Sequence, residues 1–314
     1  MSMGFEQDAA AVGRAADESV AALQAELNEA QAAYAALSGE NAALQAERAV
    51  LLARIAELEA IINPPPPPPP PPSTLFGVTV TGPVRKEYTD LHPKVAVSRV
   101  FGAGTSDWSQ EPQHKAFPNG KWAVSNSYAL SESALPRYLA TIPDAEKAKI
   151  VGYADGHELE HPDKGLWASD VRARVKRTAP IIRAAGLKPT WCMMGYSLRN
   201  DDWLNWVDPD DVDLLAFDKY NSGNKKTPPI YQDPVKMVDE AVAASRRFGK
   251  PFAFWETGTN QFGDDAARVD WTKALRAELI RQGAVCAIWF DRKSTSGSSW
   301  DASLDRASAE AWLA

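Results

Sequence analysis

The sequence of 314 residues is poor in cysteine and histidine, with two and four copies, and it holds no long uninterrupted apolar run. A helix needs about 20 mostly apolar residues to span a membrane, so we expect no membrane span. The N-terminal residues lack the basic and apolar regions of a signal peptide, and we expect no export signal. Cys192 and Cys286 lie in separate apolar runs without C-x-x-C spacing, which predicts two small buried residues.

An excess of basic residues is also missing. The chain has 34 Lys and Arg against 41 Asp and Glu, for a formal net charge of -7. Nucleic-acid phosphates bind clustered Lys and Arg, so this balance argues against a nucleic-acid partner. The sequence does not indicate a cofactor, and we expect none.

What the sequence does contain is, first, a repeat of seven residues over 20–62. Two positions of the repeat are mainly apolar, and the residues between them are mostly Ala, Glu, Gln and Arg. This pattern is typical of a coiled-coil seam. We therefore predict a coiled-coil helix over 20–62, preceded by a separate N-terminal segment, 1–19. The seam positions are Leu23, Ala30, Leu37, Leu44, Leu51 and Leu58, with Val20, Leu27, Tyr34, Asn41, Arg48, Ile55 and Ile62.

This apolar stripe predicts that the chain associates with itself. At 1.5 Å per residue the helix would be about 65 Å long, and a stripe of that length favours an oligomer over a monomer. Asn41 at a seam position beside leucines suits a parallel dimer. The segment "RIAELE", 54–59, resembles a pattern associated with three-stranded coils, and we favour a homotrimer over a dimer.

Nine consecutive prolines, 64–72, follow the predicted coil. Proline has no backbone N–H and a fixed φ, so the run ends the helix and predicts a polyproline II spacer of about 28 Å. A ligand for an SH3-type domain is the alternative, but a stiff spacer is the simpler interpretation beside a coiled coil. We expect a linker over 63–74.

After the linker, eight short apolar runs alternate with amphipathic segments that start at acidic or Ser residues and stop at Gly. This alternation predicts an α/β fold, a (β/α)8 TIM barrel over 75–314. An open doubly wound sheet is the alternative, but the first run, "FGVTVTGP", does not lead into a G-x-G-x-x-G loop. The runs span 75–80, 95–101, 121–128, 149–154, 188–196, 212–220, 250–258 and 284–291.

Polar residues stand at the ends of these predicted strands, where barrel enzymes carry their catalytic groups. Glu158 follows the fourth run and Glu256 ends the seventh. Strands four and seven lie across the barrel mouth from each other, so the two carboxylates can face one cleft. A separation of about 5–5.5 Å would suit retaining glycoside hydrolysis. We expect the other polar residues at this end to bind the substrate; they are Arg99, Asn126, His157, Asp218, Tyr220 and Asp291.

The segment "HELEH", 157–161, also satisfies the H-E-x-x-H pattern of zinc proteases. That pattern works on a helix, which turns both histidines toward one metal. Here Pro162 disfavours the helical conformation at His161, and in an extended chain the two histidines would lie about 13 Å apart. We expect no metal site, and we expect Glu160 to be a solvated loop carboxylate.

Most of the C-terminal domain resembles the clan A glycoside hydrolases, particularly family 26-like enzymes and related barrels at the ends of phage minor tail proteins. The segments that carry the resemblance are "GHELEHP", "LLAFDKYN" and "KPFAFWETG", in that order. The resemblance implies that Glu158 is the acid/base and Glu256 the nucleophile. It also implies that His157 and Tyr220 are their hydrogen-bonding neighbours and that Trp289 is a sugar-stacking floor.

The combination of a rod, a proline spacer and a barrel resembles a phage minor tail protein. This implies synthesis in the host cytoplasm, assembly at the tail tip of the virion, and other tail proteins as partners. We expect the barrel to bind and hydrolyse a host cell-surface polysaccharide. A receptor-binding module without turnover and a purely structural tail component are the alternatives.

Overall fold

The computed structural model of the chain describes residues 3–62, 73–80, 86–102, 107–110, 117, 119–126, 130–221, 230–262, 265–292 and 302–314. The chain divides into two compact units, Met1–Pro69 and Pro70–Ala314. The prolines 64–72, for which a rigid spacer is predicted, lie outside the described residues. Within the described ranges, no helix combines the length and hydropathy needed to cross a membrane.

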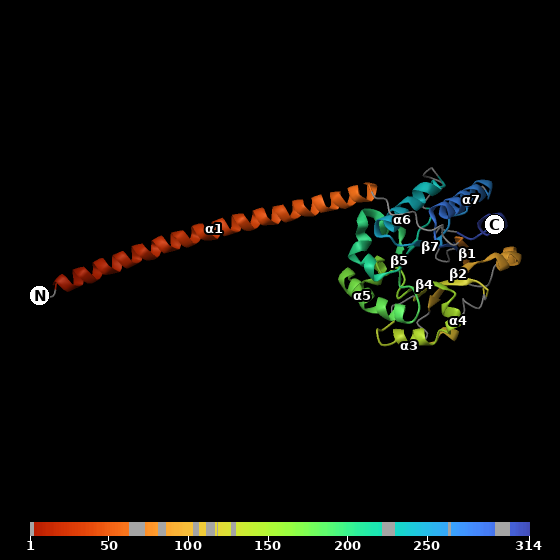
Figure 1. The fold of residues 1–314 in the computed structure, drawn as a ribbon, viewed down its shortest axis with the longest axis horizontal. Helices are drawn as coiled ribbons and strands as arrows, with labels where there is room; N and C mark the ends of the chain where they lie inside the picture. The colour runs from red at the N-terminus through yellow and green to blue at the C-terminus, as the bar shows by residue number, and fades with distance from the viewer. Residues whose placement is uncertain are drawn as a thin grey trace. The chain divides into compact units, whose positions relative to one another are not determined.

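The first unit is one continuous helix, α1 (Met3–Ile62) (Figure 1). A helix over 20–62 is therefore present, but it begins earlier than predicted. Residues 3–19 include five alanines and no proline, so helix propensity gives no reason to stop before Met3. Leu23, Leu37 and Leu44 of the heptad pattern are exposed on α1. Association through this stripe stays a prediction.

The second unit is built on eight parallel strands, and each of them overlaps a predicted run. In the sheet the strands follow the order β4-β3-β2-β1-β8-β7-β6-β5. Their bounds are β1 (Leu75–Val80), β2 (Val97–Gly102), β3 (Lys121–Asn126), β4 (Ile150–Ala154), β5 (Thr190–Met194), β6 (Leu214–Asp218), β7 (Phe252–Thr257) and β8 (Cys286–Asp291).

The sheet curves round into a nearly closed barrel. β1 pairs with β8 from Leu75↔Cys286 to Val80↔Asp291. Between β4 and β5 the contact is a single bridge, in which the Tyr153 N–H donates to the Lys188 carbonyl at 2.9 Å. This eight-stranded parallel arrangement is consistent with the predicted (β/α)8 barrel.

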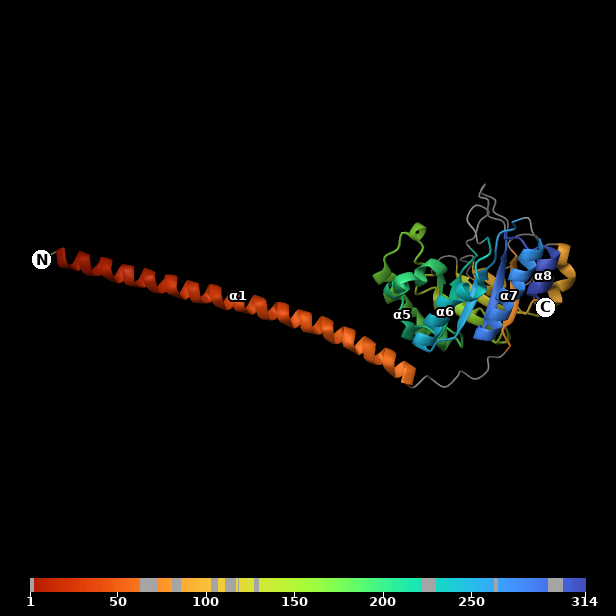
Figure 2. The same cartoon turned by 90° about the horizontal axis from the view of Figure 1, so that it is seen from above.

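Helices surround the strands (Figure 2). The helix α6 shows why such segments start and stop where they do: the Asp233 carboxylate accepts a hydrogen bond from the Val235 N–H at 3.0 Å, and Gly249 ends the helix with a φ of 59°. The α-helices are α3 (Leu135–Ala140), α4 (Asp144–Lys147), α5 (Ala168–Ala184), α6 (Pro234–Phe248), α7 (Asp265–Gln282) and α8 (Arg306–Trp312). The 3₁₀ helices are η1 (Lys86–Lys94), η2 (Trp108–Gln110), η3 (Pro162–Lys164), η4 (Gly195–Asn205) and η5 (Pro209–Asp211).

Alternate residues of each strand belong to two different apolar layers. Phe217 and Phe254 face outward and pack with helix residues such as Met237. Ala216 and Ala253, one position away, fill the centre of the barrel. Because this alternation continues to the carboxyl ends of the strands, the inward residues there decide what lines the barrel mouth.

Candidate active site

Four side chains meet inside the barrel at the carboxyl ends of the strands. They are Arg99 of β2, Cys192 of β5, Asp218 of β6 and Glu256 of β7, and all four are buried. Arg99 and Cys192 lie two residues beyond the inward Val97 and Thr190, as strand alternation requires. A register shift between Phe254 and Thr257 gives β7 one more residue than β8, and Glu256 lies within this bulge.

The loop after β4 adds His157 and Glu158 to this group. Glu158 has a φ of 47°, and it is the non-glycine residue with a positive φ among those that the structure describes. A bulky residue in the left-handed region is strained, and such strain is concentrated at functional sites. The backbone is therefore bent at the residue that was predicted to be the acid/base.

Arg99 holds the centre of the group together. Its Nη2 atom donates to His157 Nδ1 at 2.9 Å and to Cys192 Sγ at 3.3 Å, and it lies 3.9 Å from Asp218 Oδ2. The guanidinium carbon stacks 4.5 Å from the ring centroid of Trp255. It also lies 5.1 Å from the ring centroid of Phe101, so Arg99 is a buried cation that contacts these polar groups and two aromatic rings.

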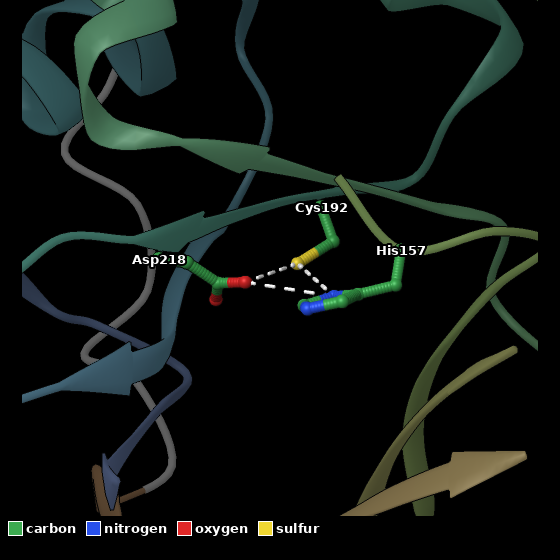
Figure 3. A group of neighbouring side chains, drawn as sticks. All are labelled: His157, Cys192 and Asp218. Carbon is green, nitrogen blue, oxygen red and sulfur yellow. Dashed lines mark hydrogen bonds and ion pairs between the residues drawn. The ribbon is translucent and has the colours of Figure 1, made fainter. Parts of the chain in front are cut away.

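The side chains of His157, Cys192 and Asp218 converge as a set of metal ligands would (Figure 3), and their donor atoms lie within 4.8 Å of one another. The Arg99 Nη2 atom contacts all three of these donor atoms. A metal ion would need bonds of about 2.0–2.3 Å to the same atoms, which leaves it no room beside the guanidinium. The residues present therefore fit a guanidinium group and not a metal ion.

His157 brings the two predicted catalytic glutamates together. Since Nδ1 accepts from Arg99, the proton of the neutral ring is on Nε2. Nε2 lies 3.5 Å from Glu158 Oε2 and 3.7 Å from Glu256 Oε1. Glu158 Oε2 and Glu256 Oε1 are therefore separated by no more than the sum of these two distances. The spacing of about 5–5.5 Å found in retaining enzymes is below this limit.

Burial and charge set the protonation of these groups. Burial, together with the charges of Arg99 and Lys164, lowers the pKa of His157 well below its ordinary value, so the ring is neutral at neutral pH. Burial raises the pKa of Glu158, although Arg99 and a hydrogen bond to Asp218 act against it. Burial and the nearby charge of Glu256 raise the pKa of Asp218 well above its ordinary value.

Glu256 is contacted by one hydrogen-bond donor and one cation. The Tyr220 hydroxyl donates a short hydrogen bond to Glu256 Oε2, and Arg99 Nε lies 4.0 Å from Oε1. Burial raises the pKa of Glu256 to about 7, while Arg99 and Tyr220 act to lower it and the charge of Glu158 acts to raise it. Burial and the charge of Glu256 raise the pKa of Tyr220, which therefore stays a proton donor.

Comparison with known proteins finds similarity in the fold of the barrel. No protein-family model matches the sequence, and no curated protein matches it. Solved structures do match. A family 128 (subgroup II) endo-β-1,3-glucanase from Sorangium cellulosum aligns with a TM-score of 0.53 and 14% identity, over 77% of this chain and 98% of that chain. The barrel therefore has the same fold as this enzyme.

Two further solved structures are similar to this chain. A family 128 (subgroup I) endo-β-1,3-glucanase from Amycolatopsis mediterranei, in complex with laminaripentaose, has a TM-score of 0.52 and 12% identity over 77% of this chain and 99% of that chain. A family 26 endo-β-1,4-mannanase from Bacillus sp. JAMB-750 has a TM-score of 0.49 and 14% identity over 72% of this chain and 79% of that chain. At these identities, the family 128 matches show the fold alone.

Of the predicted site residues, the structure brings Arg99, His157, Glu158, Asp218, Tyr220 and Glu256 together. Arg99 and Asp218 were predicted to contact substrate, but their side chains are completely buried. They therefore do not face solvent, and they contact His157 and, through Arg99, Glu256 from inside the barrel.

Trp289, predicted to be a sugar-stacking floor, is fully buried on the outer side of β8. Its ring packs against Trp271 of α7 and Trp312 of α8, with centroids 6.2 and 5.5 Å away, and its indole N–H donates to the Ala302 carbonyl at 2.7 Å. No face of the ring is left for a sugar, so Trp289 is a core residue.

Asn126 and Asp291 also lie away from the glutamates. Asn126 is buried on the outer side of β3, where its amide donates to Tyr153 Oη at 2.8 Å. Asp291 is buried and accepts a hydrogen bond from the Leu304 N–H at 2.8 Å, which fixes the chain that follows β8. Both side chains point outward by strand alternation, so the predicted substrate contacts are wrong in this structure.

Sequence reasoning missed two aromatic residues of the barrel mouth, Phe101 and Phe290. Both are partly exposed. The Phe290 ring lies 6.2 Å from Tyr220 and 6.5 Å from Phe101, and Phe101 lies 5.3 Å from His157, all measured between ring centroids. Counting in twos from the inward residues Ile288 and Arg99 would have found both. Phe101 and Phe290 therefore pack against His157 and Tyr220, the two residues next to the glutamates.

The second half of the "HELEH" segment is also different from the prediction. Glu160 is buried, and its Oε1 atom accepts hydrogen bonds from the Met194 N–H at 2.6 Å and the Ser197 hydroxyl at 3.2 Å. Since it is buried, Glu160 is not the solvated carboxylate that was predicted. Its hydrogen bonds join the loop after β4 to the end of β5 and the loop that follows. His161 is extended, with φ -65° and ψ 131°, and caps η3, so the zinc-protease helix is not formed.

Proposed function

We propose that the barrel is a retaining glycoside hydrolase that acts on a polysaccharide, with Glu256 as nucleophile and Glu158 as acid/base. The observation that carries this proposal is that both carboxylates face His157 Nε2, within 3.7 Å, at the carboxyl end of a (β/α)8 barrel. Catalytic groups of such barrels are found at this end. The fold shared with glycoside hydrolases supports the same reaction class.

The geometry suits the two steps of retention. In the first, Glu256 attacks the anomeric carbon, the glycosidic C–O bond breaks, and Glu158 gives its proton to the leaving oxygen. In the second, Glu158 takes a proton from water, whose oxygen attacks the same carbon and releases Glu256. The charge of Glu158 contributes to raising the pKa of Glu256, so protonation of Glu158 favours the ionised nucleophile.

The neighbours of the glutamates have supporting roles. Tyr220 and Arg99 stabilise the ionised form of Glu256, and His157 Nε2–H points at both carboxylates. Phe101 and Phe290 present partly exposed rings on which the apolar face of a sugar can rest.

The test is release of reducing ends from laminarin, β-1,4-mannan and bacterial envelope polysaccharides. Wild type should release sugar from one of these, and Glu256→Gln should reduce the rate by at least about a thousandfold, since a lost nucleophile costs several kcal/mol. Glu240→Gln, an exposed residue of α6, is the matched control. Equal rates for wild type and Glu256→Gln would contradict the assignment.

We propose also that the protein is a phage tail-tip component, made in the host cytoplasm and assembled into the virion through a trimeric α1 coil. The heptad pattern of α1 and the exposure of its leucines support the coil. In this assignment the barrel meets a host cell-surface polysaccharide and α1 joins other tail proteins. Immunogold labelling of purified virions with an antibody to the barrel tests the location, since labelling away from the tail tip would contradict it.

The burial of Glu256, whose side chain is only 6% exposed, favours one second candidate, a receptor-binding barrel that holds glycan without turnover. The two candidates differ in a time course. Glycan binding with no new reducing ends after prolonged incubation would favour the receptor module over the hydrolase.

A further inference from the structure

The loop between β4 and α5 carries an exposed apolar surface that the reaction does not use. Trp167 is 77% exposed and Leu166 45% exposed. In Figure 2 the chain between β4 and α5 stands out from the body of the barrel. Tryptophan is costly to leave in water, and exposed patches of large apolar side chains mark binding surfaces.

A third exposed residue lies on the neighbouring loop. Tyr196, at the start of η4 after β5, is 41% exposed. The large apolar side chains exposed in the described part of the barrel are Leu166, Trp167, Tyr196, Val235 and Ile280. Three of these five therefore lie on the two loops that follow β4 and β5, at the catalytic end.

Glu160 joins these two loops beside the catalytic acid/base. Its Oε1 atom accepts from Met194 N and Ser197 Oγ, the residues on either side of Gly195 and Tyr196. Tyr196 therefore lies in a segment that is held in place by Glu160, two residues after Glu158. Burial, together with the charges of Glu160, Glu158 and Asp163, raises the pKa of Tyr196.

Trp167 is held on the same side by the backbone. Gly165 turns the chain with a φ of 62° after η3, and the Trp167 carbonyl then accepts from Asp170 N and Val171 N at the start of α5. Trp167 follows Lys164 by three residues, so the α-carbons of Trp167 and Lys164 are at most about 11 Å apart. The indole is anchored at the end of a helix and points to solvent.

We propose that Leu166, Trp167 and Tyr196 form a platform that binds a stretch of glycan beside the reacting sugar, so that the barrel cuts internal bonds of a polysaccharide. The inference rests on the proposed hydrolysis. The two exposed rings stack on the apolar faces of successive sugars. Exposed apolar side chains on the acid/base loop and on the loop after β5 can bind a long glycan chain, but they add no contacts to a short one that ends at the glutamates.

The experiment compares Trp167→Ala with wild type on the polysaccharide that wild type cleaves fastest and on the trisaccharide of the same linkage. We expect kcat/KM on the polysaccharide to fall by about tenfold, the effect of losing one stacked ring, with the trisaccharide unchanged. Trp167→Phe should restore most of the activity. Ile280→Ala on α7, which is 44% exposed, is the control and should leave both substrates unchanged.

The other results are equally decisive. Unchanged cleavage of the polysaccharide by Trp167→Ala, or an equal loss on both substrates, would overturn the platform and leave the hydrolase assignment standing. If wild type cleaves no glycan, the proposed hydrolysis fails, and binding of laminarin, mannan and envelope polysaccharide to the protein is measured instead. Loss of this binding in Trp167→Ala supports the platform. Absence of binding to wild type overturns it.

Discussion

The Arg99 Nη2 atom donates a hydrogen bond to His157 Nδ1 at 2.9 Å, and this contact orients the site. It leaves the proton of the neutral imidazole on Nε2, which faces both Glu158 and Glu256. A buried arginine thus acts through one ring on two carboxylates, one in the loop after β4 and one on β7.

Tyr220→Phe removes the donor to Glu256 and tests how the nucleophile is kept ionised. We expect kcat/KM to fall by about 10- to 100-fold, the range for a hydrogen bond to a charged group. Since Tyr220 lowers the pKa of Glu256, its loss raises that pKa, and the acid limb of the pH–rate profile moves to higher pH. An unshifted limb would contradict the role of Tyr220, and Tyr34→Phe on α1 is the control.

Glu160 predicts how the stability of the barrel depends on pH. Burial raises its pKa from 4.5 to about 7, so between these values the folded state binds more protons than the unfolded state. Stability from Glu160 is therefore greatest below about pH 4.5 and falls as the pH rises toward 7, by an amount on the order of 2 kcal/mol. Urea unfolding at pH 5 and pH 8 measures this difference.

Glu160→Gln is the matched variant for that measurement. Its amide oxygen can still accept from Met194 N, but it does not titrate. The fall in stability between pH 5 and pH 8 should be smaller in Glu160→Gln than in wild type. The same pH dependence in both proteins would assign the effect to other groups.

Substitutions of the neighbouring residues Trp289 and Phe290 test which of them is a core residue and which belongs to the site. Trp289→Ala should lower the free energy of unfolding by about 3–5 kcal/mol, since it removes a fully buried indole. Phe290→Ala, at a partly exposed position, should cost less stability and reduce glycan turnover or binding. Denaturant unfolding and glycan hydrolysis are measured on both variants. Wild-type glycan turnover by Phe290→Ala would remove Phe290 from the site.

The apolar stripe of α1 predicts the oligomeric state. Light scattering on the full chain should give the mass of a trimer, and a double change of Leu37 and Leu44 to Lys should give monomers, because charges would then lie in the seam. Ala32→Lys lies outside both sets of seam positions and should leave the trimer intact. A dimer, or a monomeric wild type, would contradict the predicted assembly.

Much of the fold follows from local patterns. Each of the eight apolar runs overlaps a strand, because parallel barrel strands are buried on both faces. The site residues Arg99 and Asp218 were found because they are polar residues near the ends of such runs. Asn126 and Asp291 were misassigned for the same reason, since the end of a run does not say which face a residue takes. Trp289 was assigned from the resemblance, and it lies on the outer face of β8.

Two features of the site could not be found in this way. Cys192 was predicted to be a small buried residue, and it is buried, but its contacts with Arg99 and Asp218 arise from three different strands. The left-handed conformation of Glu158 depends on the loop that is fixed by Glu160 and the next loop. Long-range contacts of this kind leave no periodic signal in the sequence.

The most direct test of the central assignment is the anomeric configuration of the first product, observed by proton NMR during hydrolysis of the cleaved polysaccharide. A nucleophilic Glu256 and an acid/base Glu158 predict that the new reducing end has the configuration of the bond that was cut. Product of the opposite configuration would show that water attacks the sugar directly and would contradict the role of Glu256 as nucleophile.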